Sequence, residues 1–199
     1  MSVRVVPVGT AALLAEVADA VAATGLAEWA RARGVPATEI VPGACTVLFD
    51  GVTDPAGVAA ALREWSPGDV PPPGRVVELP VRYDGADLGQ VAERWGTDAE
   101  GVIARHTALE LTSAFCGFAP GFAYLAGLPR ELQVPRLATP RTRVPAGSVA
   151  IAGEWCGVYP TASPGGWLLL GTTDAALWDP LADPPALLAP GTRVRFRRA

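Results

Sequence analysis

A proline-rich segment constrains the fold of this 199-residue chain more than any other feature. Residues 66–74 read Ser-Pro-Gly-Asp-Val-Pro-Pro-Pro-Gly, with four prolines among nine residues. Proline fixes the backbone φ angle and lacks an N–H, so such a run forms a stiff extended connector rather than a helix or a central strand. The sequence therefore predicts two domains, residues 1–70 and residues 75–199, with this connector between them.

The first predicted domain mixes short strands with helices. Apolar alternation predicts strands over residues 3–8 and 11–17, and two more within residues 40–49 around a Pro-Gly turn. A helix is predicted over residues 19–33. A second helix begins at Asp54-Pro55, with aspartate as the N-cap and proline at the first helical position. This pattern indicates a small α+β unit.

The second predicted domain changes its pattern partway along. A strand is predicted over residues 76–83 and a short helix over residues 87–95. Thr97-Asp-Ala-Glu100 has the spacing of a capping box that opens another helix. From Thr112 onward, short apolar runs alternate with Gly and Pro turns, which is typical of an all-β barrel or sandwich.

Charge and cysteine content exclude several classes of function. All 16 basic residues are arginine, so a Schiff-base lysine and a Walker-type phosphate loop are both excluded. The net charge is −4, and the one basic cluster, residues 193–198, alternates like the outer face of a strand, which argues against nucleic-acid binding. Three cysteines without C-x-x-C spacing favour reduced thiols over a disulfide scaffold or a zinc site.

The cellular location is predicted from the absence of targeting and membrane-spanning segments. No signal-peptide pattern is present at the N-terminus, so we expect a cytoplasmic protein. Residues 111–129 and 155–173 are uncharged stretches of 19 residues each. Both contain Pro and several Gly, which would break a membrane-spanning helix, so we expect strands and loops there and no membrane partner.

An aromatic segment, residues 115–129, is the first candidate site. Its aromatic residues alternate with glycine and proline, which allow close backbone approach while the rings supply walls. One interpretation is a barrel corner filled by these rings. The other is a pocket wall or a docking surface, formed by Phe118, Pro120, Gly121, Phe122 and Tyr124.

Two further segments carry groups that could hold an anion. Arg136 and Arg141 each follow a proline, and a guanidinium suits carboxylate or phosphate. The other interpretation, which these residues alone favour, is a solvated loop with surface ion pairs. The run Ser163-Pro-Gly165-Gly166 is predicted as a turn. It is either a plain hairpin turn or a nest of backbone N–H donors, with Trp167 as an adjacent wall.

His106 is the only histidine, so no histidine-rich metal site is possible and we expect no metal site in this chain. One interpretation places it half-buried near the end of a helix, where its charge suits the helix dipole. The other makes it a catalytic acid or base, because the ordinary pKa of imidazole suits neutral pH.

Several of these phrases together resemble a known family over nearly the whole chain. They include Gly117-Phe-Ala-Pro-Gly-Phe-Ala-Tyr-Leu125, Pro135-Arg136, Pro140-Arg141, Val144-Pro-Ala-Gly-Ser-Val149, Tyr159-Pro160, Ser163-Pro-Gly-Gly-Trp167 and the closing Pro190-Gly-Thr-Arg-Val-Arg-Phe196. The family is that of the B subunit of 5-oxoprolinase, also described as KipI-like or as allophanate hydrolase subunit 1. Its members often carry a basic residue where this chain has Thr172.

The resemblance implies a small N-terminal α+β domain followed by a C-terminal cyclophilin-like β-barrel. It also implies one part of a hydrolase that opens 5-oxo-L-proline to L-glutamate with ATP, together with the A and C subunits of 5-oxoprolinase. Arg136, Arg141 and the Ser163–Gly166 run would then bind substrate or phosphate, and His106 would accept a proton. No nucleotide-binding loop is recognisable, so ATP would bind at an interface or on a partner.

The resemblance leaves two other functions open. One is a KipI-like inhibitor of a sensor histidine kinase, which would dock through the aromatic residues 115–124. The other is the carboxyltransferase part of a urea carboxylase or allophanate hydrolase system. The 5-oxoprolinase assembly itself needs a surface that pairs with a partner, and residues 144–173 contain a single charge, Glu154, which is typical of an interface core.

Overall fold

The computed structural model describes residues 3–67 and 74–199. It divides into two compact units, Met1–Pro73 and Gly74–Ala199, each with its own buried core. Most of the predicted proline-rich connector, residues 68–73, lies outside the described residues. The predicted fold class, a small α+β domain followed by a β-barrel, is confirmed.

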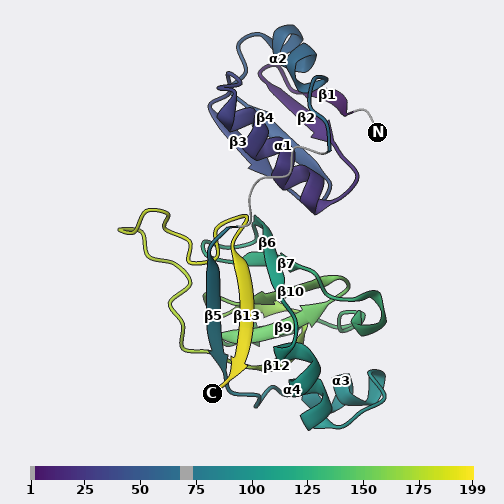
Figure 1. Cartoon of the computed structure of the whole chain (residues 1–199). Helices are drawn as coiled ribbons and strands as arrows, with labels where there is room; N and C mark the ends of the chain where they lie inside the picture. The colour runs from purple at the N-terminus through teal and green to yellow at the C-terminus, as the bar shows by residue number, and fades with distance from the viewer. Residues whose placement is uncertain (1–2, 68–73) are drawn as a thin grey trace. The chain divides into compact units, whose positions relative to one another are not determined.

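The first unit is an antiparallel four-stranded sheet with two helices. The strands β1 (Arg4–Val8), β2 (Ala12–Glu16), β3 (Glu39–Pro42) and β4 (Thr46–Asp50) lie in the order β1-β2-β4-β3. Helix α1 (Ala20–Ala32) contacts β3 and β4, and α2 (Pro55–Leu62) contacts β1 and β2 (Figure 1). Both helices start at an aspartate whose carboxylate accepts a backbone N–H, so the N-cap predicted at Asp54 is confirmed.

The second unit is a seven-stranded sheet that curls almost into a barrel (Figure 1). Its strands follow the order β12-β9-β10-β7-β6-β13-β5. They are β5 (Val76–Val81), β6 (Leu111–Cys116), β7 (Ala123–Ala126), β9 (Ser148–Ala152), β10 (Trp155–Val158), β12 (Leu168–Thr172) and β13 (Arg193–Arg198). Arg82, just after β5, forms two backbone hydrogen bonds with Thr172 of β12, at 2.9 and 2.8 Å, which brings the two edges together.

The barrel interior follows the alternation seen in the sequence. In β13, Val194 and Phe196 are buried, whereas Arg195 between them is exposed, as expected for a half-buried strand. β13 pairs parallel with β5 and antiparallel with β6. The first and last strands of the unit therefore seal one side of the barrel together.

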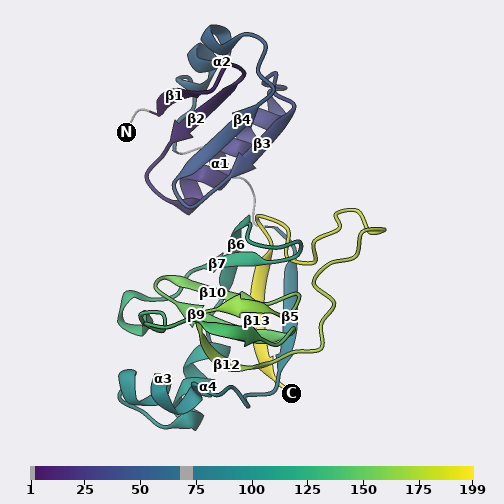
Figure 2. The same ribbon diagram turned by 180° about the vertical axis from the view of Figure 1, so that it is seen from behind.

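Two short helices, α3 (Leu88–Arg94) and α4 (Ala99–Thr107), contact β12 and β13 respectively (Figure 2). The capping residue of α4 differs from the prediction by one position. Asp98, not Thr97, is the N-cap, because its backbone is extended and its carboxylate accepts the Gly101 N–H at 2.8 Å. A short 3-10 helix, η1 (Arg130–Leu132), and a separate two-stranded ladder, β8 (Arg141–Val144) with β11 (Ser163–Gly165), complete the unit.

The two uncharged stretches form part of the barrel. Residues 111–129 contain β6 and β7, and residues 155–173 contain β10, β11 and β12. Across the described ranges, 3–67 and 74–199, no helix has both the length and the apolar content needed to cross a bilayer.

Candidate functional site

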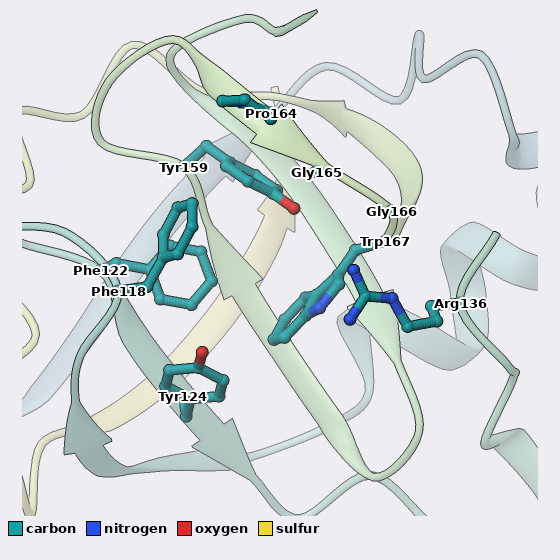
Figure 3. Close-up of a pocket in the computed structure, with 9 residues that line it drawn as sticks. All are labelled: Phe118, Phe122, Tyr124, Arg136, Tyr159, Pro164, Gly165, Gly166 and Trp167. Atoms are coloured by element: carbon teal, nitrogen blue, oxygen red, sulfur yellow. The ribbon is translucent and has the colours of Figure 1, made fainter. Parts of the chain in front are cut away.

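A cavity of about 180 Å³ lies beside the β8–β11 ladder, partly open to solvent (Figure 3). Segments that are far apart in the sequence supply its walls. They are β7 with the turn before it, the segment after η1, the residue that follows β10, and β11 with the residues that follow it. The lining residues are Phe118, Phe122, Tyr124, Arg136, Tyr159, Pro164, Gly165, Gly166 and Trp167.

Phe122 is the centre of the aromatic wall. It is only 2% exposed, and its ring packs edge-to-face against Phe118, Tyr124, Tyr159 and Trp167, with centroid separations of 5.1–5.5 Å. Such edge-to-face contacts are a favoured arrangement of aromatic rings. The wall is therefore a fixed surface already present without a ligand.

The turn that presents Phe118 is tight. Ala119 N–H donates to the Gly117 carbonyl at 2.8 Å, and Phe122 N–H donates to the Ala119 carbonyl at 2.9 Å. Phe118 itself has φ of 70°, and it is the one non-glycine residue with a positive φ within residues 3–67 and 74–199. A bulky residue rarely adopts this conformation, yet here it leaves the ring 60% exposed at the edge of the cavity.

Pro120 and Gly121, predicted as part of the same wall, do not line the cavity. Gly121 is buried with φ of 84°, and a Cβ on it would lie 2.9 Å from the Trp178 Cβ. Because Gly121 has no side chain, the turn can pack closely against residues 177–178. The glycine does not shape the cavity.

Arg136 supplies the positive charge in the cavity wall. The backbone N–H of Leu137 donates to the Gly166 carbonyl at 2.7 Å, which fixes this segment alongside the end of β11. A Cβ on Gly166 would lie 3.2 Å from Arg136 Nε and Nη2, so the missing side chain leaves room for the guanidinium. Arg136, Gly165 and Gly166 therefore line the same cavity.

Tyr159, between β10 and β11, was not among the predicted site residues. It is 2% exposed, and the backbone N–H of Trp167 acts on its hydroxyl as a donor would, lowering the pKa of the phenol. Burial raises the pKa of the Tyr159 hydroxyl, and the nearby Arg136 and Arg141 lower it to a smaller extent. The Tyr159-Pro160 pair was visible as a family phrase, and its position after an apolar strand was the available signal.

The structure corrects the turn predicted at Ser163–Gly166. Ser163–Gly165 is strand β11, paired with β8, and neither Gly165 nor Gly166 has the positive φ that distinguishes Gly9 or Gly147. The backbone is extended because it forms a ladder, so no nest of N–H donors forms there. Ser163 does not line the cavity, and its buried hydroxyl has no hydrogen-bond partner within residues 3–67 and 74–199.

Arg141, at the start of β8, lies beside the cavity without lining it. Its Nη2 donates to Asp87 Oδ1 at 2.6 Å, and the other oxygen of Asp87 accepts the Leu169 backbone N–H at 2.7 Å. Asp87 is 6% exposed. Arg141 therefore ties β8, β12 and the start of α3 together, which differs from the free anion-binding side chain that we predicted.

His106 does not reach the cavity. It is fully buried in the barrel, with Nδ1 2.7 Å from the Tyr83 hydroxyl, Nε2 3.5 Å from Cys156 Sγ, and its ring stacked on Phe196 at 4.5 Å. Burial lowers the pKa of His106 to about 3. The imidazole is therefore neutral at pH 7 and inaccessible, so the geometry gives no support to the predicted proton-accepting role or to a half-buried helix end.

Two other sequence features have a structural explanation. Thr172 does not line the cavity, and its hydroxyl donates to the Asp84 carboxylate at 3.0 Å. The charge-poor residues 144–173, expected as an interface core, are largely buried within the second unit itself, since all five residues of β9 and four of β12 are buried. In the described part of the chain, no group of three or more His, Cys, Asp or Glu side chains could hold a metal ion.

The polar side-chain groups that line the cavity are all of one kind, hydrogen-bond donors. Its polar side-chain groups are the Arg136 guanidinium, the Trp167 indole N–H and the hydroxyls of Tyr124 and Tyr159, and no carboxylate lines it. These groups can all donate hydrogen bonds. Such an arrangement suits a small ligand with carboxylate or carbonyl oxygens on one side and an apolar body that packs on aromatic rings.

Comparison with known proteins places this geometry in a family. Residues 3–188 match the family described as carboxyltransferase domain, subdomain C and D. The B subunit of 5-oxoprolinase from Escherichia coli O157:H7 is 48% identical over 138 residues, which cover 67% of this chain and 63% of that protein. The chain thus spans about three fifths of the length of the curated relatives that it matches.

Solved structures show the same fold. The crystal structure of TTHA0988 superposes with a TM-score of 0.81 at 38% identity, over 96% of this chain and 40% of that chain. The urea carboxylase of Kluyveromyces lactis superposes with a TM-score of 0.71 at 18% identity, over 99% of this chain and 22% of that chain. At this lower identity the likeness concerns the fold alone.

Proposed function

The chain belongs to the family of carboxyltransferase domains, subdomain C and D, and from this membership we propose that it is the B subunit of an ATP-dependent 5-oxoprolinase. Its relatives of known name at up to 48% identity are B subunits of 5-oxoprolinase. In this proposal the chain acts in the cytoplasm with the A and C subunits, and hydrolyses 5-oxo-L-proline to L-glutamate only as part of that assembly.

The observation that carries the proposal is the donor-lined, aromatic-walled cavity. 5-Oxoproline is a five-membered lactam ring that bears a carboxylate. Arg136 would bind the carboxylate through two N–H groups, which is the geometry that a guanidinium favours, while Phe118 and Phe122 would contact the ring. The volume of about 180 Å³ is below that of pockets for drug-sized ligands, which suits a ligand of amino-acid size.

The chemistry explains why ATP and partners are needed. A lactam carbonyl is a poor electrophile. Transfer of the terminal phosphoryl group of ATP to the ring-carbonyl oxygen releases ADP and activates the ring carbon. Water then adds to that carbon, the ring C–N bond breaks as nitrogen takes a proton, and a second water hydrolyses the resulting acyl phosphate. The part of this chain is to bind and orient the lactam, and ATP is held at an interface or by a partner.

The alternative of a kinase inhibitor that docks through residues 115–124 has less support in the geometry. Of the four aromatic residues in that segment, only Phe118 is exposed. Phe115 stacks on Tyr124 with centroids 4.4 Å apart, and Phe122 is buried behind them. The rings thus pack mainly on one another and on the cavity, which leaves a small apolar surface for a partner.

Reconstitution tests the proposed function. The chain is mixed with the A and C subunits, and ADP formation is measured with and without 5-oxoproline. We expect 5-oxoproline-dependent ATP hydrolysis only when all three proteins are present. Arg136→Met should lower kcat/KM for 5-oxoproline by about tenfold to a hundredfold, the range for loss of charged hydrogen bonds, mostly through KM.

Arg143→Met is the matched control, since Arg143 is an exposed cation on the neighbouring strand β8 and lies outside the cavity. It should retain the activity of the wild type. Equal turnover by the A and C subunits without this chain would refute its role in the assembly, and equal loss in both variants would remove Arg136 from the substrate site.

A further inference from the structure

We propose that Tyr159 is a specificity-determining residue, whose hydroxyl donates a hydrogen bond to the ring-carbonyl oxygen of the bound lactam. This inference rests on the proposed function and deepens it. It assigns the recognition of the reacting carbonyl to a residue that was not among the predicted site residues. The cavity would thereby select a cyclic amide over a ring carboxylate that lacks this oxygen.

The first argument is the direction of the Tyr159 hydroxyl proton. The backbone N–H of Trp167 lowers the pKa of the phenol, which is the effect of a donor directed at the phenol oxygen. The neighbouring Arg136 and Arg141 are donors only, so they offer the phenol proton no acceptor. The proton is therefore available to a ligand oxygen in the cavity that Tyr159 lines (Figure 3).

The second argument is that the phenol remains protonated. Burial raises the pKa of Tyr159, and this outweighs the opposing effect of the two arginines and the Trp167 N–H. A neutral phenol at physiological pH keeps its O–H donor. A site that supplies a hydrogen bond to one substrate oxygen discriminates strongly against an analogue without that oxygen, because its buried donor is left unpaired.

The third argument is that glycine at position 165 makes room for this hydroxyl. A Cβ on Gly165 would contact the Tyr159 hydroxyl and lie 2.9 Å from Cζ of the same ring. Gly165 has no positive φ. Glycine is therefore needed at this position for the room it leaves and not for its backbone freedom. Gly166 does the same for Arg136, and the two glycines let two donors converge on one cavity.

The fourth argument is the match to the ligand. In 5-oxoproline the carboxylate-bearing carbon and the carbonyl carbon both flank the ring nitrogen, so their oxygens lie toward the same edge of the ring. Arg136 and the Tyr159 hydroxyl adjoin consecutive glycines of one wall, whereas the rings of Phe118 and Phe122 pack beside the Tyr159 ring, on the side of the cavity away from Arg136 (Figure 3). One edge of the ligand can meet both donors while its carbon skeleton meets the aromatic rings.

The test compares two ligands and two proteins. The ligands are cyclopentanecarboxylate and the ring ketone carboxylate in which a methylene replaces the lactam N–H; they differ only in the carbonyl oxygen. Affinities of the full chain for both, and for 5-oxoproline, are measured by calorimetry. In the wild type we expect the ketone to bind about tenfold more tightly than its parent, and Tyr159→Phe should abolish most of this preference.

Two further variants secure the interpretation. Tyr83→Phe removes a phenol hydroxyl from the barrel core, outside the cavity, and should keep the tenfold preference. Gly165→Ala keeps the Tyr159 hydroxyl but displaces it, and should lower the preference for the ketone as Tyr159→Phe does. The proposal can therefore still be tested if one of these two variants folds poorly.

Three results would overturn the assignment. They are an unchanged preference in Tyr159→Phe, an equal loss of affinity for both ligands, and no binding of 5-oxoproline by the wild-type chain. The role in the enzyme assembly is judged separately by the reconstituted ATP hydrolysis, so a failure of Tyr159 is distinguishable from a failure of the proposed function.

Discussion

At the scale of single residues, His106 shows how burial decides the role of a titratable group. Its two ring nitrogens face the Tyr83 hydroxyl and Cys156 Sγ, and both of those groups have raised pKa values because they too are buried. Burial raises the pKa of Cys156 to about 12. The cluster therefore carries no charge at neutral pH and acts as a hydrogen-bonded part of the core.

This burial predicts a loss of stability in mild acid. The pKa of His106 falls from 6.5 to about 3 on folding, so the unfolded chain binds a proton between these pH values and the folded chain does not. Stability is thus lost as pH falls below about 6.5. Between pH 7 and pH 5 the loss from His106 should be about 2 kcal/mol, measured by urea unfolding.

His106→Gln is the comparison for this prediction, since an amide does not titrate. The variant should be less stable at pH 7 but should lack this part of the pH dependence. Carboxylates with lowered pKa values, Glu110 and Asp174, contribute at lower pH and equally in both proteins. Parallel pH profiles for wild type and variant would show that His106 is not held neutral in the folded state.

Cavity residues could be predicted from the sequence where they lie close together along the chain. Phe118, Phe122 and Tyr124 follow one another within a turn and a strand, and the structure brings them to one cavity with Arg136 and Trp167. The burial of His106 could not be predicted from residues close to it in the sequence. Its hydrogen-bond neighbours are 23 and 50 residues away, so only the barrel closure reveals them.

At the scale of elements, the Asp87–Arg141 pair joins three parts of the barrel. Asp87 precedes α3, Arg141 begins β8, and Leu169 lies in β12. The carboxylate accepts from both partners, so its removal leaves the Arg141 charge and a buried N–H without an acceptor. Breaking such a pair costs more than replacing both members.

We therefore expect Asp87→Ala to lower the free energy of unfolding by about 2–3 kcal/mol, somewhat less than for a fully buried pair because Arg141 is 28% exposed. Arg141→Met should cost less. The double variant should be more stable than the sum of the single losses implies. Urea unfolding of the four proteins measures this coupling, and additive losses would show that the pair does not stabilise the barrel.

Element boundaries were predicted well where the local signal was strong. The aspartate-proline start of α2 and the alternation of β13 depend on adjacent residues, and both are confirmed. The Ser163–Gly165 run has turn-forming residues but forms a strand, because β8 offers it a ladder. A distant partner outweighs local turn propensity there.

At the scale of the whole molecule, the buried cores of the two units share no residue. The core of the first unit contains residues between Val3 and Trp65. The second unit has a main core between Leu79 and Phe196 and a smaller cluster that includes Phe122 and Tyr159. Every residue that lines the cavity belongs to the second unit. Separate cores are the usual condition for domains that fold independently.

We therefore expect a fragment of residues 74–199 to fold cooperatively and to bind 5-oxoproline with the affinity of the full chain. Gly74 belongs in the fragment, because its carbonyl accepts a hydrogen bond from Arg193 Nε at 3.3 Å. Near-ultraviolet circular dichroism and calorimetry measure the outcome.

A shorter fragment that ends at residue 192 is the control, since it lacks β13 and with it Val194 and Phe196 of the core. That control should be unfolded, because β5 and β6 both lose their neighbour in the sheet. A 74–199 fragment without fixed tertiary structure would show instead that the barrel depends on the first unit, and independent folding of the two units would be refuted.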